Sequence, residues 1–267
     1  MASHPIVLTI AGSDSSGGAG IQADIKTLSA LGAYSASVIT SVTAQNTLGV
    51  QAVHPLPTAI IDAQLRAVFD DLAISCVKIG MLNTASTIHL VAQILREYRP
   101  KYVVLDPVMI STSGKSLIEA EAIHALVSEL FPVSTLITPN IPEAAAILGS
   151  PPTQSKVEMH AALKELSQLG SSFTLLKGGH LPGKLCIDLL AENKKVHEFT
   201  QTKIQTTHTH GTGCTLASAI SAYLAFDCKI IEAVAKANNY LNGAIQHADD
   251  LNIGNGSGPV HHFHNHW

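Results

Sequence analysis

Short apolar runs alternate with segments of helical periodicity along the whole chain. Residues 6–10 form an apolar, β-branched run, and apolar residues then recur three or four apart from Ile21 to Leu31, where Gly32 marks a helix end. The same alternation predicts further strands at 37–42, 77–79, 102–105, 135–138 and 173–177, and a hairpin at 185–190 and 196–199. It predicts further helices at 60–72, 88–95, 120–130, 142–148, 157–169, 214–226 and 229–249.

Continuous apolar strands separated by helices are typical of an α/β protein whose mainly parallel sheet is buried on both faces. No internal repeat or linker-like segment interrupts the pattern, so we expect one domain over residues 1–267. Ligands of such sheets bind at the carboxyl ends of the strands. The polar residues that follow the predicted strands are therefore the candidates for a site, and they lie at 12–20, 45–46, 80–81, 106, 140, 177–180 and 208–214.

The composition narrows the class of protein. Of the 267 residues, 46% are hydrophobic and 13% are charged, which excludes a disordered or coiled-coil chain. The net charge of −4 gives no basic footprint for nucleic acid. Mean hydropathy is +0.25, but the apolar runs are shorter than the ~18 residues of a membrane span. Residues 1–5 lack the basic start of an export signal, so we expect a cytoplasmic protein.

The cysteines give one candidate for chemistry. Cys76, Cys186, Cys214 and Cys228 match no zinc-binding spacing, and a disulfide framework is not expected in a chain of this size without an export signal. Cys76 and Cys186 lie within apolar runs and are interpreted as small buried residues. Cys214 differs because it directly follows a glycine motif.

A glycine-rich loop at 12–20 follows the first predicted strand and opens the first helix. It is not a Walker A loop, because position 18 is Gly where that motif has Lys. Residues 18–23 satisfy the G-x-G-x-x-A dinucleotide pattern, but no acidic residue follows the second strand. The loop is either a tight turn with packing value only or a loop whose backbone approaches a ligand.

The most specific motif is His-Gly-Thr-Gly-Cys-Thr at 210–215, followed by small and apolar residues of helical character. Two glycines at a helix N-terminus allow successive N–H groups to converge on an anion. Cys214 is expected in the first helical turn, where its thiol pKa should be lowered, and a thiolate there could act as a general base. The alternative is that Cys214 is a small residue chosen for tight packing.

Residues whose side chains carry oxygen atoms follow two further predicted strands. Asp106, together with Asn140 and Glu143, could hold hydrated Mg²⁺ beside phosphates, although Glu143 could equally serve helix capping. Residues 177–180 place Lys177 where a cation could meet phosphate, or they form a simple turn. The histidine-rich segment 260–266 could also bind a metal ion.

Taken together, these motifs resemble one known family, the hydroxymethylpyrimidine/phosphomethylpyrimidine kinases of thiamine biosynthesis. The resemblance spans the chain and rests on 8–14, 16–24, 44–47, 78–82, 106–109, 138–144, 177–180, 210–215 and 258–264. It implies a ribokinase-like three-layer αβα sandwich, ATP and Mg²⁺ as cofactors, and a homodimer. It also implies two successive phosphorylations of 4-amino-5-hydroxymethyl-2-methylpyrimidine. Cys214 stands where most ribokinase-like enzymes have Asp, which argues against sugar and nucleoside kinases.

The resemblance also implies a role for each site residue. Gln45 would hydrogen-bond the aminopyrimidine edge and Met81 would lie against the ring, with Gly12 and Asp24 on the substrate side. Asp106 and Glu143 would bind the metal, and Lys177, Asn140 and Thr212 would bind the nucleotide. Gly211 and Gly213 would form the anion hole beside Cys214, the base.

Three alternatives to this function stay open at the level of sequence. A pyridoxal kinase of the same fold would phosphorylate a similar hydroxymethyl heterocycle. A catalytically silent vitamin-binding module would lack Mg²⁺-dependent turnover, and a nicotinamide-dependent oxidoreductase would bind that cofactor.

Overall fold

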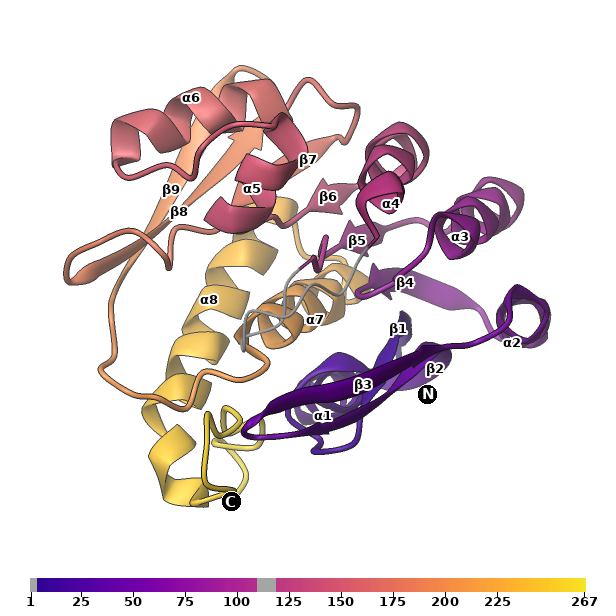
Figure 1. The fold of residues 1–267 in the computed structure, drawn as a ribbon, viewed down its shortest axis with the longest axis horizontal. Helices are drawn as coiled ribbons and strands as arrows, with labels where there is room; N and C mark the ends of the chain where they lie inside the picture. Colours follow the sequence, from indigo (N-terminus) through magenta and orange to yellow (C-terminus); the bar gives the residue numbers. More distant parts are fainter. Residues whose placement is uncertain (1–3, 110–118) are drawn as a thin grey trace.

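A single twisted sheet organises the computed structural model, which describes residues 4–109 and 119–267. Nine strands are present in this described part, and their order across the sheet is β3-β2-β1-β4-β5-β6-β7-β8-β9 (Figure 1). The strands are β1 (Ile6–Asp14), β2 (Tyr34–Asn46), β3 (Gly49–Pro55), β4 (Ile74–Ile79), β5 (Val103–Leu105), β6 (Leu136–Ile137), β7 (Phe173–Leu176), β8 (Leu185–Glu192) and β9 (Lys195–Thr202). Residues 1–3, part of the argument against an export signal, lie outside the described residues.

Six adjacent strands at the centre of the sheet are parallel to one another, in the order β2-β1-β4-β5-β6-β7. At one edge β3 pairs antiparallel with β2, and at the other edge β8 pairs antiparallel with β7 and with β9. The antiparallel pair β8–β9 is the hairpin that the sequence predicted. A buried parallel centre with antiparallel edges confirms the prediction of a mainly parallel α/β sheet.

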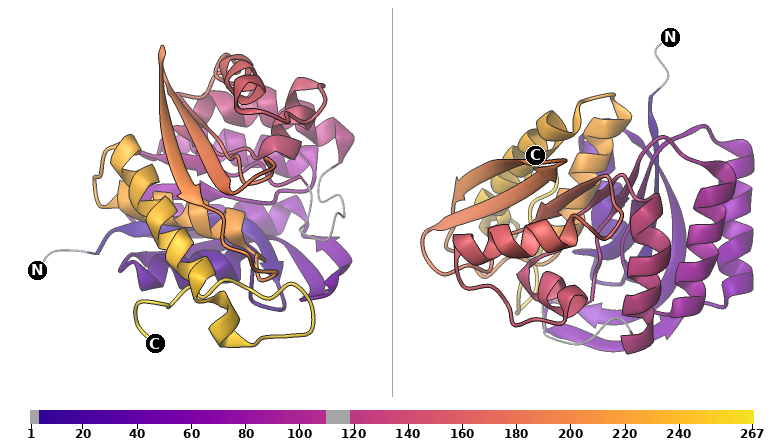
Figure 2. Two further views of the ribbon diagram at one scale, coloured as in Figure 1. Left: turned by 90° about the vertical axis from the view of Figure 1, so that its left-hand side faces the viewer. Right: turned by 90° about the horizontal axis from the view of Figure 1, so that it is seen from above.

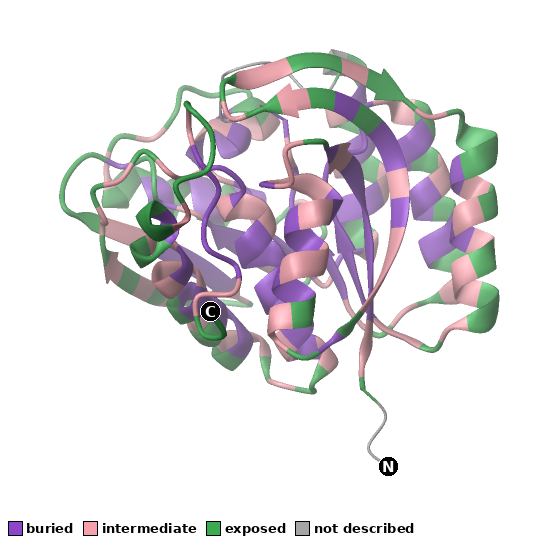
Figure 3. Cartoon of the chain, turned by 90° about the horizontal axis from the view of Figure 1, so that it is seen from below, coloured by how far each residue is buried: buried purple, intermediate pink, exposed green. Residues whose placement is uncertain are grey.

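Helices cover both faces of the sheet (Figures 1 and 2). They are α1 (Gly20–Ala30), α2 (Thr58–Asp71), α3 (Ala85–Tyr98), α4 (Ala120–Ala125), α5 (Ile141–Leu148), α6 (Lys156–Leu166), α7 (Thr212–Ala225) and α8 (Ile230–Gln246). Because successive strand residues point to opposite faces, Leu8 packs with the α2 and α3 side while Val7 packs with α7 and α8. Figure 3 shows the resulting burial of the central strands and of the inner helix faces.

The β2–β3 hairpin is the main departure from the predicted elements. The second strand was predicted at 37–42, but it continues to Asn46 and then pairs antiparallel with β3. Most residues of β3 are exposed or half-buried, so its sequence lacks the apolar alternation of a strand that covers a core. Gln45 therefore lies on an extended strand and not on a loop after it.

The helix predicted at 120–130 also differs in detail. It is α-helical only over Ala120–Ala125, continues as a π-helical turn at Leu126–Leu130 and ends in a 3₁₀ turn at Phe131–Val133. Pro132 has no N–H to continue an α-helical ladder, which explains why regular geometry stops here.

A fully buried ion pair joins the sheet to the helices on one face. The Lys78 ammonium, on β4, lies 2.9 Å from both carboxylate oxygens of Asp24 on α1, and neither side chain is exposed. Thr9 on β1 and Ser218 on α7 also donate to this carboxylate, over 2.6 and 2.7 Å. One carboxylate thus connects four elements.

We expect Asp24→Asn to lower the free energy of unfolding by about 3–5 kcal/mol, because it leaves the Lys78 charge buried without its counter-charge. The double substitution Asp24→Asn with Lys78→Met should recover most of that loss, since it removes the unpaired charge as well. Urea denaturation of the three proteins measures both effects. A loss of under about 1 kcal/mol for Asp24→Asn would contradict this account.

Candidate active site

A cavity of about 640 Å³ opens at the carboxyl ends of the parallel strands. It is the position that the strand pattern predicted for a ligand. All but one of the site residues predicted from the sequence line it, namely Gly12, Gln45, Met81, Asp106, Asn140, Glu143, Lys177, Gly211, Thr212, Gly213 and Cys214.

Asp24 is the exception, and we withdraw it from the substrate side. Its carboxylate is fully buried and is occupied by Lys78, Thr9 and Ser218. It is not among the described residues that line the cavity. The sequence could not separate the two cases, because an acidic residue on the first helix suits a ligand and a buried cation equally well.

One end of the cavity places the Gln45 carboxamide beside Met81 and Gly12. Met81 packs so closely against Gly12 that a Cβ atom on Gly12 would lie 2.4 Å from the Met81 Cε atom. The Gln45 amide nitrogen lies 3.3 Å from His210 Nε2, and the Gln45 amide oxygen lies 3.2 Å from Thr43 Oγ1, which donates to the Ser13 carbonyl over 2.9 Å. These neighbours place the carboxamide at the cavity wall, where its donor and acceptor groups could meet the edge of a heterocycle.

Asp14 and His210 are two residues of this end to which the sequence analysis assigned no role. His210 Nε2 lies 2.8 Å from Asp14 Oδ2, which also accepts hydrogen bonds from the Gly18 and Ala19 N–H groups. Burial alone would raise the Asp14 pKa, but the hydrogen bonds from His210, Ser16 and Ala19 prevail and lower it to about 2. The ionised Asp14 carboxylate therefore holds the glycine-rich loop in shape. An acidic residue inside a glycine-rich loop is the signal that could have indicated this.

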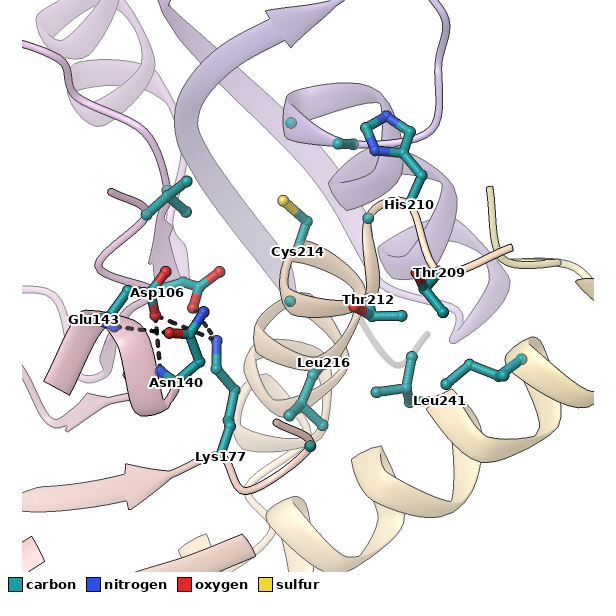
Figure 4. A pocket seen from close by; sticks show the side chains of 18 of the residues that line it. Asp106, Asn140, Glu143, Lys177, Thr209, His210, Thr212, Cys214, Leu216 and Leu241 are labelled. Carbon is teal, nitrogen blue, oxygen red and sulfur yellow. Dashed lines mark hydrogen bonds and ion pairs between the residues drawn. The ribbon is translucent and has the colours of Figure 1, made fainter. Parts of the chain in front are cut away.

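The loop before α7 comes into direct backbone contact with the glycine-rich loop. Gly211 is the N-cap of α7 and has a φ of 83°, in the left-handed region. A Cβ atom added to Gly211 would lie 1.8 Å from the Gly18 carbonyl oxygen. Cys214 follows in the first helical turn and is half-buried between the two ends of the cavity (Figure 4).

The predicted lowering of the Cys214 pKa is wrong for the protein without ligands. Desolvation by burial, together with the charges of Asp24 and Asp106, raises the thiol pKa to about 11. Lys78 and a hydrogen bond from the Gly20 N–H act in the opposite direction and do not prevail. The favourable helix N-terminus is thus outweighed chiefly by burial of the thiol, with a smaller contribution from two carboxylates that lie far away in the sequence.

The other end of the cavity holds a cation between two carboxylates (Figure 4). Lys177 Nζ donates to Asp106 Oδ1 over 2.7 Å and lies 3.9 Å from Glu143 Oε2. Burial alone would raise the Asp106 pKa, but Lys177 and Lys78 prevail and lower it. Glu143 is different, because burial raises its pKa to about 7 despite Lys177, and the charge of Asp106 adds to the rise.

Asn140 and Glu143 also cap helix α5, as the structural interpretation of the sequence predicted. The Glu143 N–H donates to Asn140 Oδ1 and the Asn140 N–H donates to Glu143 Oε2, each over 2.8 Å. This capping box fixes the Glu143 carboxylate at the cavity wall, so capping and a second role for the same carboxylate are compatible.

The donor set at this end fits a hydrated Mg²⁺. Magnesium is usually held by one or two carboxylates together with substrate phosphates and water, and Asp106 and Glu143 supply two buried carboxylates. A second cation would also balance the Glu143 charge that burial disfavours. Within residues 4–109 and 119–267, no cluster of three or more His, Cys, Asp or Glu side chains could hold a metal, and this includes the histidine-rich segment.

A buried acidic residue beyond Lys177 was missed by the sequence analysis. Asp188 on β8 accepts a hydrogen bond from the Gly178 N–H over 2.9 Å, and burial raises its pKa. It orders the turn after β7, and with it the position of Lys177. Its neighbours in sequence are apolar, so the sequence pattern indicates only a strand at this position and no functional residue.

Comparisons with known proteins agree with this geometry. The family model described as phosphomethylpyrimidine kinase matches residues 14–261. The hydroxymethylpyrimidine/phosphomethylpyrimidine kinase of Rhizobium meliloti is 48% identical over 262 residues, which cover 98% of each chain.

Two solved structures share the fold. The phosphomethylpyrimidine kinase of Clostridium difficile superposes with a TM-score of 0.80 at 46% identity, over 90% of this chain and 99% of that one. The ADP complex of Bacillus subtilis pyridoxal kinase superposes with a TM-score of 0.90 at 34% identity, over 97% of this chain and 98% of that one. These neighbours confirm the ribokinase-like fold that the resemblance implied.

We expect iodoacetamide to modify Cys214 slowly at pH 7 in the free protein, because only the thiolate reacts and a pKa of about 11 keeps the thiol protonated. The rate should rise about tenfold per pH unit from pH 8 to 10, since the thiolate fraction grows in that proportion below the pKa. Mass spectrometry of the peptide that contains Cys214 measures this rate, with N-acetylcysteine as the control. Faster reaction than the control at pH 7 would contradict the raised pKa.

Proposed function

Because the chain belongs to the phosphomethylpyrimidine kinase family, we infer that it converts 4-amino-5-hydroxymethyl-2-methylpyrimidine to the monophosphate and then to the diphosphate. ATP is the phosphate donor, and the reactions belong to thiamine biosynthesis. The enzyme is a phosphotransferase.

One observation carries this function at the level of the site. A single cavity joins the carboxamide and methionine end, near Gln45, to the cation and carboxylate end, near Lys177. Cys214 and the turn before α7 lie between these ends. Phosphoryl transfer depends on positioning and charge neutralisation, and this arrangement offers an acceptor subsite and a phosphate subsite with an anion-binding turn between them.

For the acceptor subsite, we propose that Gln45 hydrogen-bonds the aminopyrimidine edge and that the ring lies against Met81 and Gly12. A carboxamide has both a donor and an acceptor group, which suits a ring nitrogen beside an exocyclic amine. The contact between Met81 and Gly12 supports this role, because it leaves a narrow apolar wall for a flat ring.

For the phosphate subsite, we propose that Asp106 and Glu143 hold Mg²⁺ and that Lys177, Asn140 and Thr212 bind the nucleotide phosphates. The metal would neutralise phosphate charge as the reaction proceeds. Lys177 already lies within reach of both carboxylates, so it is placed to meet the same phosphates.

For the transfer itself, we propose that the N–H groups at Gly211–Gly213 stabilise the transferred phosphoryl group and that Cys214 takes the proton of the substrate hydroxyl. The thiol must first lose its own proton, so its pKa has to fall from about 11 when substrates bind. The charge of Asp106 is one cause of the raised pKa. Compensation of that charge in the loaded enzyme would favour the thiolate.

We also propose that the protein is a cytoplasmic homodimer that binds neither nucleic acid nor membrane. The family resemblance favours the dimer, and light scattering on purified protein measures it. In the described part of the chain, no helix combines the length and the hydropathy of a membrane span.

Product analysis tests the function. With Mg²⁺ and ATP, purified protein should convert the hydroxymethylpyrimidine to its monophosphate and then to its diphosphate, and omission of Mg²⁺ should abolish turnover. Pyridoxal in place of the pyrimidine is the control, because kinases of that specificity share the fold. Efficient phosphorylation of pyridoxal without any pyrimidine product would overturn the proposed function.

Two substitutions should each change a different kinetic constant. Cys214→Ala should lower kcat about 10²–10⁴-fold with little change in KM, because a general base acts in the transfer step only. Gln45→Ala should weaken pyrimidine affinity about tenfold to a hundredfold, because a buried polar edge loses a partner worth about 1–3 kcal/mol.

Steady-state kinetics on both variants, with Cys76→Ala as the matched control for a cysteine outside the cavity, measures the split. Near-normal turnover of folded Cys214→Ala would mean that the backbone anion hole alone carries the transfer. Unchanged pyrimidine affinity in Gln45→Ala would rule out the proposed hydrogen bond between Gln45 and the aminopyrimidine edge.

A further inference from the structure

The segment 258–262 lies between helix α8 and the loop that precedes α7. The His210 N–H donates to the Gly258 carbonyl over 3.1 Å, and the His261 N–H donates to the Ala244 carbonyl on α8 over 2.9 Å. Tyr240 on α8 donates its hydroxyl hydrogen to the His262 carbonyl. The segment is therefore fixed by its backbone on both sides, and its Val260 side chain is fully buried.

From this segment, the His262 side chain reaches the first turn of α7. Its Nε2 atom lies 3.2 Å from Thr215 Oγ1, and Thr215 Oγ1 lies 2.8 Å from the Gly211 carbonyl oxygen. Both side chains are buried. The three groups form a chain of hydrogen bonds from the C-terminal segment to the N-cap of α7.

The direction of these hydrogen bonds follows from the single hydrogen of the Thr215 hydroxyl. Thr215 has one hydroxyl hydrogen, and it must go to the Gly211 carbonyl, because a carbonyl oxygen can only accept. The Thr215 oxygen then accepts from His262, so the Nε2 atom of His262 bears the hydrogen. Burial lowers the His262 pKa to about 3, assisted by the positive charge of Lys26, so the ring is neutral and keeps this role at physiological pH.

The end of the chain is the carbonyl that determines the geometry of the anion-binding turn. The Gly211 carbonyl accepts from the Thr215 N–H over 2.9 Å as well as from its hydroxyl. The planar peptide ties the Gly211 carbonyl to the Thr212 N–H, which also donates to the Thr209 carbonyl over 3.3 Å. A tilt of the Gly211 carbonyl would therefore turn the Thr212 N–H and shift the turn at Gly211–Gly213 relative to the phosphoryl group.

We propose that His262 is a positioning residue for phosphoryl transfer, acting through the Thr215 hydroxyl on the Gly211 carbonyl to hold the anion-binding turn in its working orientation. This inference rests on the proposed role of that turn. It assigns to the histidine-rich segment a structural task in catalysis in place of metal binding.

The first test is kinetic. His262→Ala should lower kcat about tenfold to a hundredfold, because small misplacements of the reacting geometry cost that much. KM for the pyrimidine should stay within about twofold, since the end of the cavity near Gln45 and Met81 is untouched. His262→Gln should restore much of kcat, because its amide N–H can replace the Nε2–H donor. His266→Ala is the matched control and should behave as wild type, because the His266 ring lies in the histidine-rich segment 260–266 but contacts the Ala30 carbonyl and Phe263.

The second test asks whether His262 acts through Thr215. Thr215→Val removes the hydroxyl at nearly constant shape and should lower kcat as His262→Ala does, whereas Thr215→Ser keeps the hydroxyl and most of the activity. In the double variant of Thr215→Val and His262→Ala, the loss should be no greater than in either single variant, because one chain has been broken twice.

The outcomes separate this inference from the proposed function. Wild-type turnover of the pyrimidine establishes the function on its own. Unchanged kcat in folded His262→Ala, losses that multiply in the double variant, or a fall in melting temperature with unchanged kcat would each overturn the positioning role. If His262→Ala does not fold, Thr215→Val and Thr215→Ser decide the matter, because they leave the segment 258–262 intact.

Discussion

The architecture of this kinase depends on the buried carboxylate of Asp24, which needs hydrogen-bond donors to be stable in the core. Asp24 accepts from Lys78, Thr9 and Ser218, which lie on three different elements, and removal of any one would leave charge or polarity unmatched in the core. The constraint fixes helix α7 against strands β1 and β4. It thereby fixes where the first turn of α7, with Cys214, stands relative to the strand ends.

A second constraint is the contact between two glycine turns. The backbones at Gly18 and Gly211 approach too closely for a Cβ atom on Gly211, and Asp14 and His210 join the same two loops by side chain. The glycine-rich loop and the turn before α7 are therefore held together by both backbone and side-chain contacts. This explains how segments about two hundred residues apart can form one cavity wall of fixed geometry.

The sequence was informative where local pattern and local chemistry coincide. Apolar runs and helical spacing located the parallel strands, and residues at strand ends such as Asp106 and Lys177 do gather in one cavity. The β2–β3 hairpin was not predicted because its exposed residues carry no core pattern. The burial of Asp24 and the raised pKa of Cys214 arise from neighbours distant in the chain, and no local rule contains them.

The position of the segment 258–262 has a consequence for how the protein is made. Domains emerge from the ribosome from the N-terminus onward, at about 5–20 residues per second. The glycine-rich loop at 12–20 emerges about two hundred residues before its partner Gly211, and the segment that bonds to His210 emerges later still. A nascent chain therefore has the glycine-rich wall of the cavity well before it has the turn that packs against that wall.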